Sequence, residues 1–200
     1  SPVKFVINGC ELLTLIASSH DLEFLVTGFL YLQGFIMKLS EIQKLELSKD
    51  ASMVTITIDE TIPDNIVPTL TSGGGRGIFY SPSTSPFPVN RARQKLACFQ
   101  PETIIDLMTE MDKKSIRYTE HGGIHAAGIG REKGLLIHAE YIGRHNTIDR
   151  LAGEALFKQI DTRAPRVGMP HHRCYRNKAS ERFIFTGKSG VEVLSLDTGW

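Results

Sequence analysis

The chain has 200 residues, enough for one large domain or two small lobes, and 41% of them are hydrophobic, enough to form a core. Its 23 basic and 22 acidic residues leave a net charge of +1, which argues against a general nucleic-acid-binding protein. No apolar run approaches the roughly 20 residues that span a bilayer, and no signal peptide is visible at the start, so we expect no membrane association. The cysteines Cys10, Cys98 and Cys174 are odd in number and far apart, which favours the cytoplasm over a disulfide framework.

Residues 1–60 predict a small N-terminal α+β lobe. Residues 3–7 and 11–15 have strand character, and the Asn8-Gly9 pair between them favours a tight hairpin. Residues 54–58 alternate Val or Ile with Thr, as expected of a half-buried strand.

A helix is predicted within this lobe. Apolar residues recur with a helical period between Leu22 and Leu30, and Ser18 resembles a helix start. Gly34 is suited to ending the helix in a left-handed cap. Beyond it, residues 61–95 are rich in Gly, Pro and Ser and predict a loop or linker.

Residues 96–200 predict a second, larger lobe. Pro101 suits the first turn of a helix. Residues 124–127 and 134–137 predict two strands around a turn at residues 130–133. The apolar stripes of the two predicted helices are Ile104, Ile105, Met108 and Met111, and then Ile148, Leu151, Ala152, Ala155, Leu156 and Ile160.

The remainder of this lobe is less regular. Residues 162–178 predict a basic, irregular segment, residues 183–185 a short strand, and residues 191–196 the start of a last helix. Strands that alternate with helices indicate an α/β fold with a mixed sheet.

The string Gly143-Arg144-His145-Asn146 lies where a predicted strand turns into a helix. Glycine allows close backbone approach, N–H groups at a helix start attract anions, and the arginine fork suits phosphate. The string therefore indicates a phosphate site. The alternative is that Asn146 caps the helix, Asp149 is a favourable first-turn acid and Arg144 is solvated.

A second string also joins glycine and histidine at the start of a strand. Gly122 and Gly123 precede His125, and the residues that follow are small, which leaves room for a ligand. Ligands of open α/β sheets bind at such junctions. The alternative is a core histidine bonded to the backbone.

Two further strings are weaker. His171-His172-Arg173-Cys174 has zinc-binding residue types, but the alternative is a basic surface loop, because the zinc-deaminase motifs are absent. The segment from Ser72 to Gly77 is glycine-rich without the ending of a phosphate-binding P-loop, which favours a flexible loop.

In order and spacing, these strings resemble the FdhD family of formate dehydrogenase accessory proteins. The matching segments are Ile7-Asn8-Gly9, His20-Asp21-Leu22-Glu23, Gly28-Phe29-Leu30, Gly34-Phe35-Ile36, Gly122 to Ala127, Gly143 to Asn146 with Asp149, and Thr186-Gly187-Lys188 with Glu192.

The resemblance implies a sulfurtransferase that carries sulfur from a cysteine desulfurase to the molybdenum cofactor of a formate dehydrogenase. That cofactor is bis-molybdopterin guanine dinucleotide, for which GDP is an analogue. A homodimer and a larger lobe similar to cytidine deaminase, without its zinc chemistry, are also implied. The implied cofactor-binding residues are Gly122, Gly123, His125, Gly143, Arg144, His145, Asn146 and Asp149.

The chain departs from this family at the loop that carries its reactive C-G-x-C-G cysteines. The corresponding segment, Ser72 to Gly77, has no cysteine, and a persulfide requires a thiolate. Cys98, just before the predicted Pro101 helix, is the candidate replacement, and the alternative is a small buried hydrophobe.

Three further positions differ, and the sequence leaves other functions open. Tyr141, His121 and Arg150 replace an aspartate, a threonine and a lysine, and relatives continue beyond Trp200 through a strand, a helix and a strand. The alternatives are a non-catalytic cofactor- or partner-binding homologue that has lost sulfur transfer, and a nucleotide hydrolase of deaminase-like fold.

Overall fold

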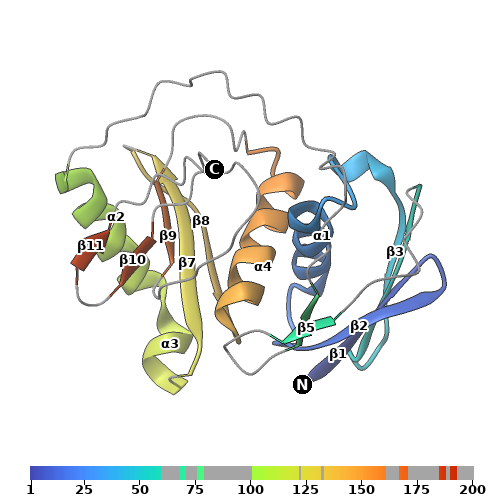
Figure 1. Cartoon of the computed structure of the whole chain (residues 1–200). Coiled ribbons are helices and arrows are strands. Elements are labelled where there is room, and N and C mark those ends of the chain that lie inside the picture. Colours follow the sequence, from blue (N-terminus) through green and yellow to red (C-terminus); the bar gives the residue numbers. More distant parts are fainter. Residues whose placement is uncertain are drawn as a thin grey trace.

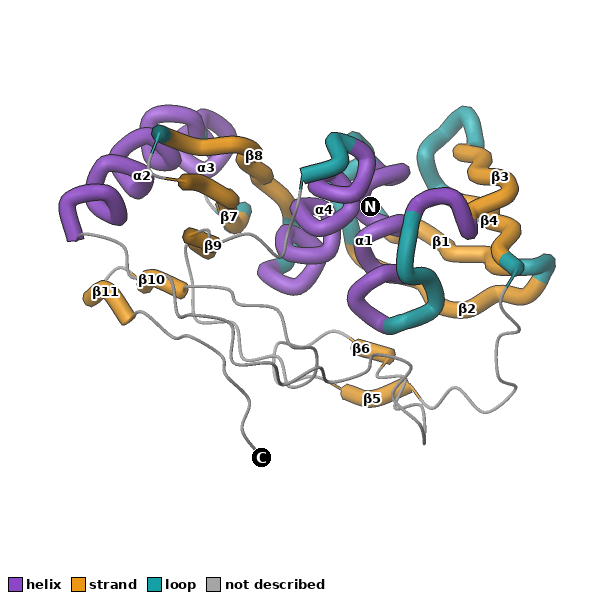
Figure 2. Tube along the Cα trace, turned by 90° about the horizontal axis from the view of Figure 1, so that it is seen from above, coloured by secondary structure: helices purple, strands orange, loops and turns teal. Residues whose placement is uncertain are grey.

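The computed structural model describes most of residues 1–60, for which we keep the name N-terminal lobe, and the central part of residues 96–200, for which we keep the name second lobe. Side chains are described for residues 1–59, 101–120, 123–131 and 133–160, and the backbone also for 121, 68–70, 76–78, 167–170, 185–187 and 190–192. Figure 1 shows the elements in layers: α2 and α3, a sheet containing β7 and β8, helices α4 and α1, and the N-terminal sheet. Seen from above, the two sheets again lie on opposite sides of the helix pair (Figure 2).

The N-terminal sheet has the strand order β2-β1-β4-β3, in which β1 is parallel to β4 and antiparallel to β2. One face of the sheet and helix α1 enclose a shared core that includes Phe5, Phe29 and Ile56. The elements of this lobe are β1 (Pro2–Ile7), β2 (Cys10–Ile16), α1 (Leu22–Gln33), a 3-10 turn (Leu39–Glu41), β3 (Ile42–Leu47) and β4 (Met53–Ile58).

The predicted hairpin is confirmed. Asn8 and Gly9 have φ values of 50° and 83°, the left-handed conformation that the type I′ turn of a two-residue hairpin has at both positions. The side chain of Asn8 also accepts a hydrogen bond from the Ile58 N–H at 2.9 Å, which ties the turn to β4.

Helix α1 is confirmed, but its predicted start is wrong. The helix ends at Gly34, whose φ of 82° gives the left-handed cap. At the other end the capping position is Asp21, which makes no side-chain capping bond. Ser18 instead accepts a hydrogen bond from the Ile142 N–H at 3.2 Å, so its hydroxyl joins the two lobes.

The second sheet has the order β8-β7-β9, with β7 antiparallel to both neighbours. Helix α2 packs on one face, where its Leu107 would collide with any side chain at Gly130. Helix α4 packs on the other face through Ile148, Leu151 and Ala155. The elements are α2 (Pro101–Lys114), α3 (Ile116–His121), β7 (His125–Arg131), β8 (Gly134–Tyr141), α4 (Arg144–Phe157) and β9 (Val167–Pro170).

Two predictions in this region need correction. Ile105 is 57% exposed, and Leu107 takes its place in the buried stripe of α2 because the stripe follows the face that packs on β7. The turn predicted at residues 130–133 is shorter, since β7 continues through Arg131 and β8 begins at Gly134.

Short strands occur where irregular or helical structure was predicted. β5 (Pro68–Leu70) pairs with β6 (Arg76–Ile78) inside the predicted linker, and β9 lies inside the predicted irregular segment. β10 (Phe185–Gly187) pairs with β11 (Gly190–Glu192), so a helix start at Val191 is wrong. Val191 lies opposite Thr186, and such β-branched residues favour strands.

The lobes join where α1 crosses α4 at two facing glycines. A Cβ atom on Gly28 would lie 1.7 Å from the Asp149 carbonyl oxygen, and one on Gly153 would lie 1.9 Å from the Phe24 carbonyl oxygen. The two backbones therefore touch, which only glycine permits. In the part of the chain with assigned structure, no helix has the length and hydropathy needed to cross a membrane.

Candidate functional site

The structure brings the two glycine- and histidine-containing strings together at one edge of the second sheet, the edge that is formed by the ends of its strands. His125, the first residue of β7, pairs with Tyr141, the last residue of β8. Helix α4 begins three residues later at Arg144, after the glycine at 143. This edge, at the bottom of Figure 1, lies beside the start of α1, and we call it the helix-start edge.

At this edge the backbone before α4 adopts a conformation suited to glycine. Gly143 has φ 84° and ψ 121° and is the capping residue of the helix. The first backbone hydrogen bond of the helix runs from the Thr147 N–H to the Gly143 carbonyl at 3.0 Å. The N–H groups of Arg144, His145 and Asn146 therefore precede the intrahelical bonds, which is the arrangement that attracts anions.

Asn146 and Asp149 lie in the interior of the protein. Asn146 does not cap the helix, because α4 begins before it, and its Nδ2 donates to the carbonyls of Ile16 at 2.8 Å and Ile142 at 3.0 Å. Asp149 is only 3% exposed and lies beyond the first turn, so it is not a first-turn acid. Asn146 thus ties the turn before α4 to the end of β2, and the Asp149 carbonyl lies against Gly28 of α1.

The remaining predicted site residues differ in how far they are described. Gly123 is exposed with φ 65°, and His125, Gly143, Arg144 and His145 are half-buried. Gly122 and Cys98 lie outside the described residues, as do His171 to Cys174. Among the residues that the structure describes, no three or more metal-binding side chains form a group.

The loop between β2 and α1 is bound to the helix-start edge. The Tyr141 hydroxyl shares its one proton between the carbonyl oxygens of Ser18 at 2.7 Å and His20 at 2.9 Å. Tyr141 is fully buried, and this burial, with Asp21 nearby, raises the pKa of its hydroxyl, which therefore stays a donor. The tyrosine thus holds the loop where the resemblance predicts an aspartate.

A chain of charged side chains continues from this loop into α4. Arg150 donates to the Asp21 carboxylate at 3.0 Å, to the His138 carbonyl at 3.0 Å and to Glu154, and its guanidinium lies 5.5 Å from the Phe24 ring centre. Burial alone would raise the pKa of Asp21, but hydrogen bonds from His20 and Arg150 outweigh it and lower the pKa. The planar guanidinium of Arg150 has several N–H donors and binds three acceptors at once. The single ammonium group of a lysine at position 150 could not do so equally well.

His138 and Ser115 form a contact that is structural. The Ser115 hydroxyl donates to the Met111 carbonyl at 2.8 Å and lies 3.0 Å from Nε2 of His138. Its proton is therefore committed to the backbone, and Ser115 is only 1% exposed. Burial lowers the pKa of His138, so the imidazole is held neutral. This pair does not have the arrangement of a serine nucleophile and its base.

Comparison with known proteins agrees with this fold. Residues 1–168 match the model of the FdhD/NarQ family. The sulfur carrier proteins FdhD of Staphylococcus aureus strains MRSA252 and Newman are 27% identical over 199 residues, which cover 96% of this chain and 68% of those proteins.

A solved structure shows the same fold. It is that of a protein from Desulfotalea psychrophila assigned as a formate dehydrogenase accessory protein, with a TM-score of 0.60 and 19% identity. The match covers 86% of this chain and 64% of the crystallised one, so the chain spans less than two thirds of that structure. With the family match over most of its length, this chain belongs to the FdhD/NarQ family.

Proposed function

We propose that this protein is an accessory protein for formate dehydrogenase maturation that binds bis-molybdopterin guanine dinucleotide through its guanine nucleotide parts. The observation that carries the proposal is the meeting of the Gly123–His125 and Gly143–His145 segments at one edge. The names of the relatives, sulfur carrier protein and formate dehydrogenase accessory protein, support the biological context.

The residues at this edge fit a phosphate-containing ligand. The N–H groups at the start of α4 offer donors and a positive helix end, and Arg144 adds a charged fork. Gly143 would bring the backbone close to the phosphate, because it has no side chain in the way. The cofactor, when bound, supplies the metal to which sulfur is delivered.

For sulfur transfer, we assign the role of the persulfide-carrying thiol to Cys98. In this step the Cys98 thiolate takes the outer sulfur of the desulfurase persulfide, and the desulfurase thiolate leaves. Cys10 is exposed and free, but it begins β2, whose other end, Ile16, lies at the helix-start edge. At about 3.3 Å per strand residue, Cys10 lies roughly 20 Å from that edge.

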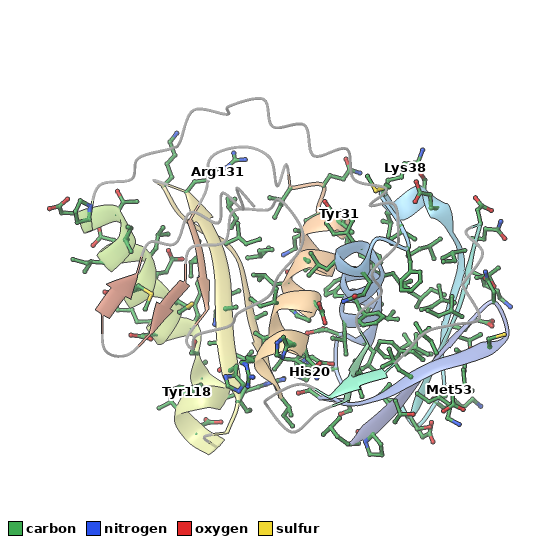
Figure 3. All side chains as sticks on the ribbon, viewed as in Figure 1. His20, Tyr31, Lys38, Met53, Tyr118 and Arg131 are labelled. Atoms are coloured by element: carbon green, nitrogen blue, oxygen red, sulfur yellow. The ribbon has the colours of Figure 1, made fainter. Side chains whose placement is uncertain are left out.

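Calorimetric titration with GDP tests cofactor binding. We expect saturable binding that weakens strongly in Arg144→Ala and His125→Ala, because each removes a donor at the edge. Arg131→Ala is the matched control, since Arg131 is exposed and lies at the opposite end of β7 (Figure 3). If the folded protein does not bind GDP, or if Arg144→Ala binds as well as the original chain, this assignment of the site is wrong.

Sulfur transfer needs its own test. The protein is incubated with a cysteine desulfurase and ³⁵S-labelled cysteine, and label on the chain is measured without reducing agent. Label should be lost in Cys98→Ser and kept in Cys10→Ser. If the chain without substitutions binds GDP but acquires no ³⁵S label, the result favours the second candidate. This candidate is a cofactor- or partner-binding homologue without sulfur transfer. The lack of cysteine between Ser72 and Gly77 is the observation that supports this candidate.

The proposal includes partners. Formate dehydrogenase and a cysteine desulfurase are the expected partner proteins, and the chain is expected to act as a homodimer. Co-purification with each enzyme and the mass in solution by light scattering test these expectations directly.

A further inference from the structure

Two nitrogen-bearing side chains from different lobes meet at the helix-start edge. Arg117, the second residue of α3, directs its Nη1 at Nε2 of His20, which belongs to the loop between β2 and α1. Figure 3 shows His20 and Tyr118, the neighbour of Arg117, on the same edge of the molecule. Neither side chain is among the residues that the family resemblance assigns to the site.

The backbone of Arg117 is fixed by a hydrogen bond to Glu140, whereas its side chain can bind a ligand. The Glu140 carboxylate accepts hydrogen bonds from the N–H groups of Arg117 at 3.3 Å and Tyr118 at 2.7 Å, which fixes the start of α3 to β8. The residue is exposed, and its guanidinium has no carboxylate partner within the described residues. A guanidinium has five N–H donors, and the contact with His20 involves only one of its nitrogen atoms.

The second ring nitrogen of His20, Nδ1, fixes the orientation of the imidazole through its contact with Asp21. Its Nδ1 lies 2.9 Å from the Asp21 carboxylate, which also binds Arg150 of α4. The ring packs edge-on against Tyr141 of β8, with 5.1 Å between ring centres. With Nδ1–H donating to Asp21, Nε2 is the acceptor that faces Arg117.

We propose that Arg117 and His20 form a second anion-binding point at this edge, which receives a phosphate group of the bound nucleotide. The inference rests on the proposed nucleotide binding and extends it to residues from both lobes. A phosphate oxygen enters between the two side chains and accepts hydrogen bonds from the guanidinium and from Nε2–H of a protonated His20. Asp21 stabilises the imidazolium through Nδ1–H, as a carboxylate orients a catalytic histidine.

The proposed geometry predicts that phosphate binding takes up a proton. In the free protein, Nε2 of His20 faces the permanently charged guanidinium of Arg117, which can only donate a hydrogen bond. The other charged groups around the ring are Asp21, Arg150 and, behind α3, Glu140. The anion replaces the Arg117 contact, and His20 then needs a proton on Nε2 to donate to it.

The test is calorimetry with GDP and with inorganic pyrophosphate, in two buffers of different ionisation enthalpy. The original chain should take up a proton with either ligand. Arg117→Gln should weaken both by roughly ten- to a hundredfold, as expected for lost charge-assisted hydrogen bonds. His20→Gln should bind more weakly and without proton uptake, while Arg131→Gln should behave as the original chain does.

Each outcome separates this inference from the proposed function. If GDP binds and depends on Arg144, but Arg117→Gln and His20→Gln bind normally with unchanged proton uptake, the second anion point is wrong and the proposed function stands. If pyrophosphate binds with proton uptake that depends on His20 while GDP does not bind, the anion point stands and the nucleotide function fails. If a folded chain binds neither ligand, both are overturned; circular dichroism of each variant identifies those that fail to fold.

Discussion

Substitution of Gly153 by alanine is the most direct test of how the two lobes are joined. The added Cβ would lie 1.9 Å from the Phe24 carbonyl oxygen, whereas ordinary contact begins at 3.4 Å. Helices α1 and α4 must therefore separate by about 1.5 Å, because the obstructing atom is backbone and protein interiors are close-packed.

The expected loss of stability combines two opposing effects. Overpacking costs about 1–3 kcal/mol and sometimes more, and backbone contact places this site at the upper end of that range. Alanine in a helix returns about 1 kcal/mol relative to glycine. We therefore expect the free energy of unfolding to fall by about 2 kcal/mol or more, which lowers the urea midpoint by roughly 1 M for a typical slope.

Urea denaturation followed by circular dichroism measures this effect. Gly9→Ala is the control, since no atom lies within 4 Å of its added Cβ and only the left-handed φ of 83° is unfavourable. Gly28→Ala should destabilise like Gly153→Ala, and the double variant should lose less than the two losses combined, because helices already separated make room for both. An unchanged or increased midpoint for Gly153→Ala would refute the close crossing of α1 and α4.

Three further predictions concern Asn146 and Arg150, which join the lobes, and His138 of β8. Asn146→Ala should lower the free energy of unfolding by about 1–3 kcal/mol, because the hydrogen bonds from its side chain to the Ile16 and Ile142 carbonyls are lost, each worth about 0.5–1.5 kcal/mol; a neutral effect in urea denaturation would argue against this bridge. Arg150→Met should cost about 1–3 kcal/mol, because Asp21 and Glu154 lose the bonds to the guanidinium but keep His20 and Lys158 as partners, while Arg150→Lys should cost less; equal thermal stabilities of the two variants would contradict this. Because burial lowers the pKa of His138, the unfolded chain binds more protons, so stability should fall as the pH drops below the ordinary value of 6.5. His138→Gln should reduce that slope between pH 7.5 and 5.5, and an unchanged slope would show that other groups cause it.

Local patterns in the sequence were sufficient for several elements. The Asn8-Gly9 hairpin, the cap at Gly34 and the start of α2 at Pro101 follow from the conformational limits of single residues, and all three are confirmed. The alternation in residues 54–58 gave the buried face of β4 correctly, because a strand packed on one side repeats every second residue.

Predictions failed where a distant partner decides the role of a side chain. Ser18 resembled a helix cap, but its hydroxyl is bonded to the Ile142 N–H, far away in sequence. Asn146 is of a residue type that often caps helices, but its side chain instead bridges the lobes. The roles of Arg117 and His20 had no local signal either, since each depends on an element from the other lobe.

The sequence by itself determined the family, the mixed α/β class and the two strings at the helix-start edge, because these depend on residue order, periodicity and glycine positions. Only the tertiary structure decided that Gly28 and Gly153 face each other and that Tyr141 and Arg150 hold the loop before α1. The physical reason is the range of the interactions: turns and caps are fixed by neighbours along the chain, whereas the contacts that assemble the edge join residues more than 100 positions apart.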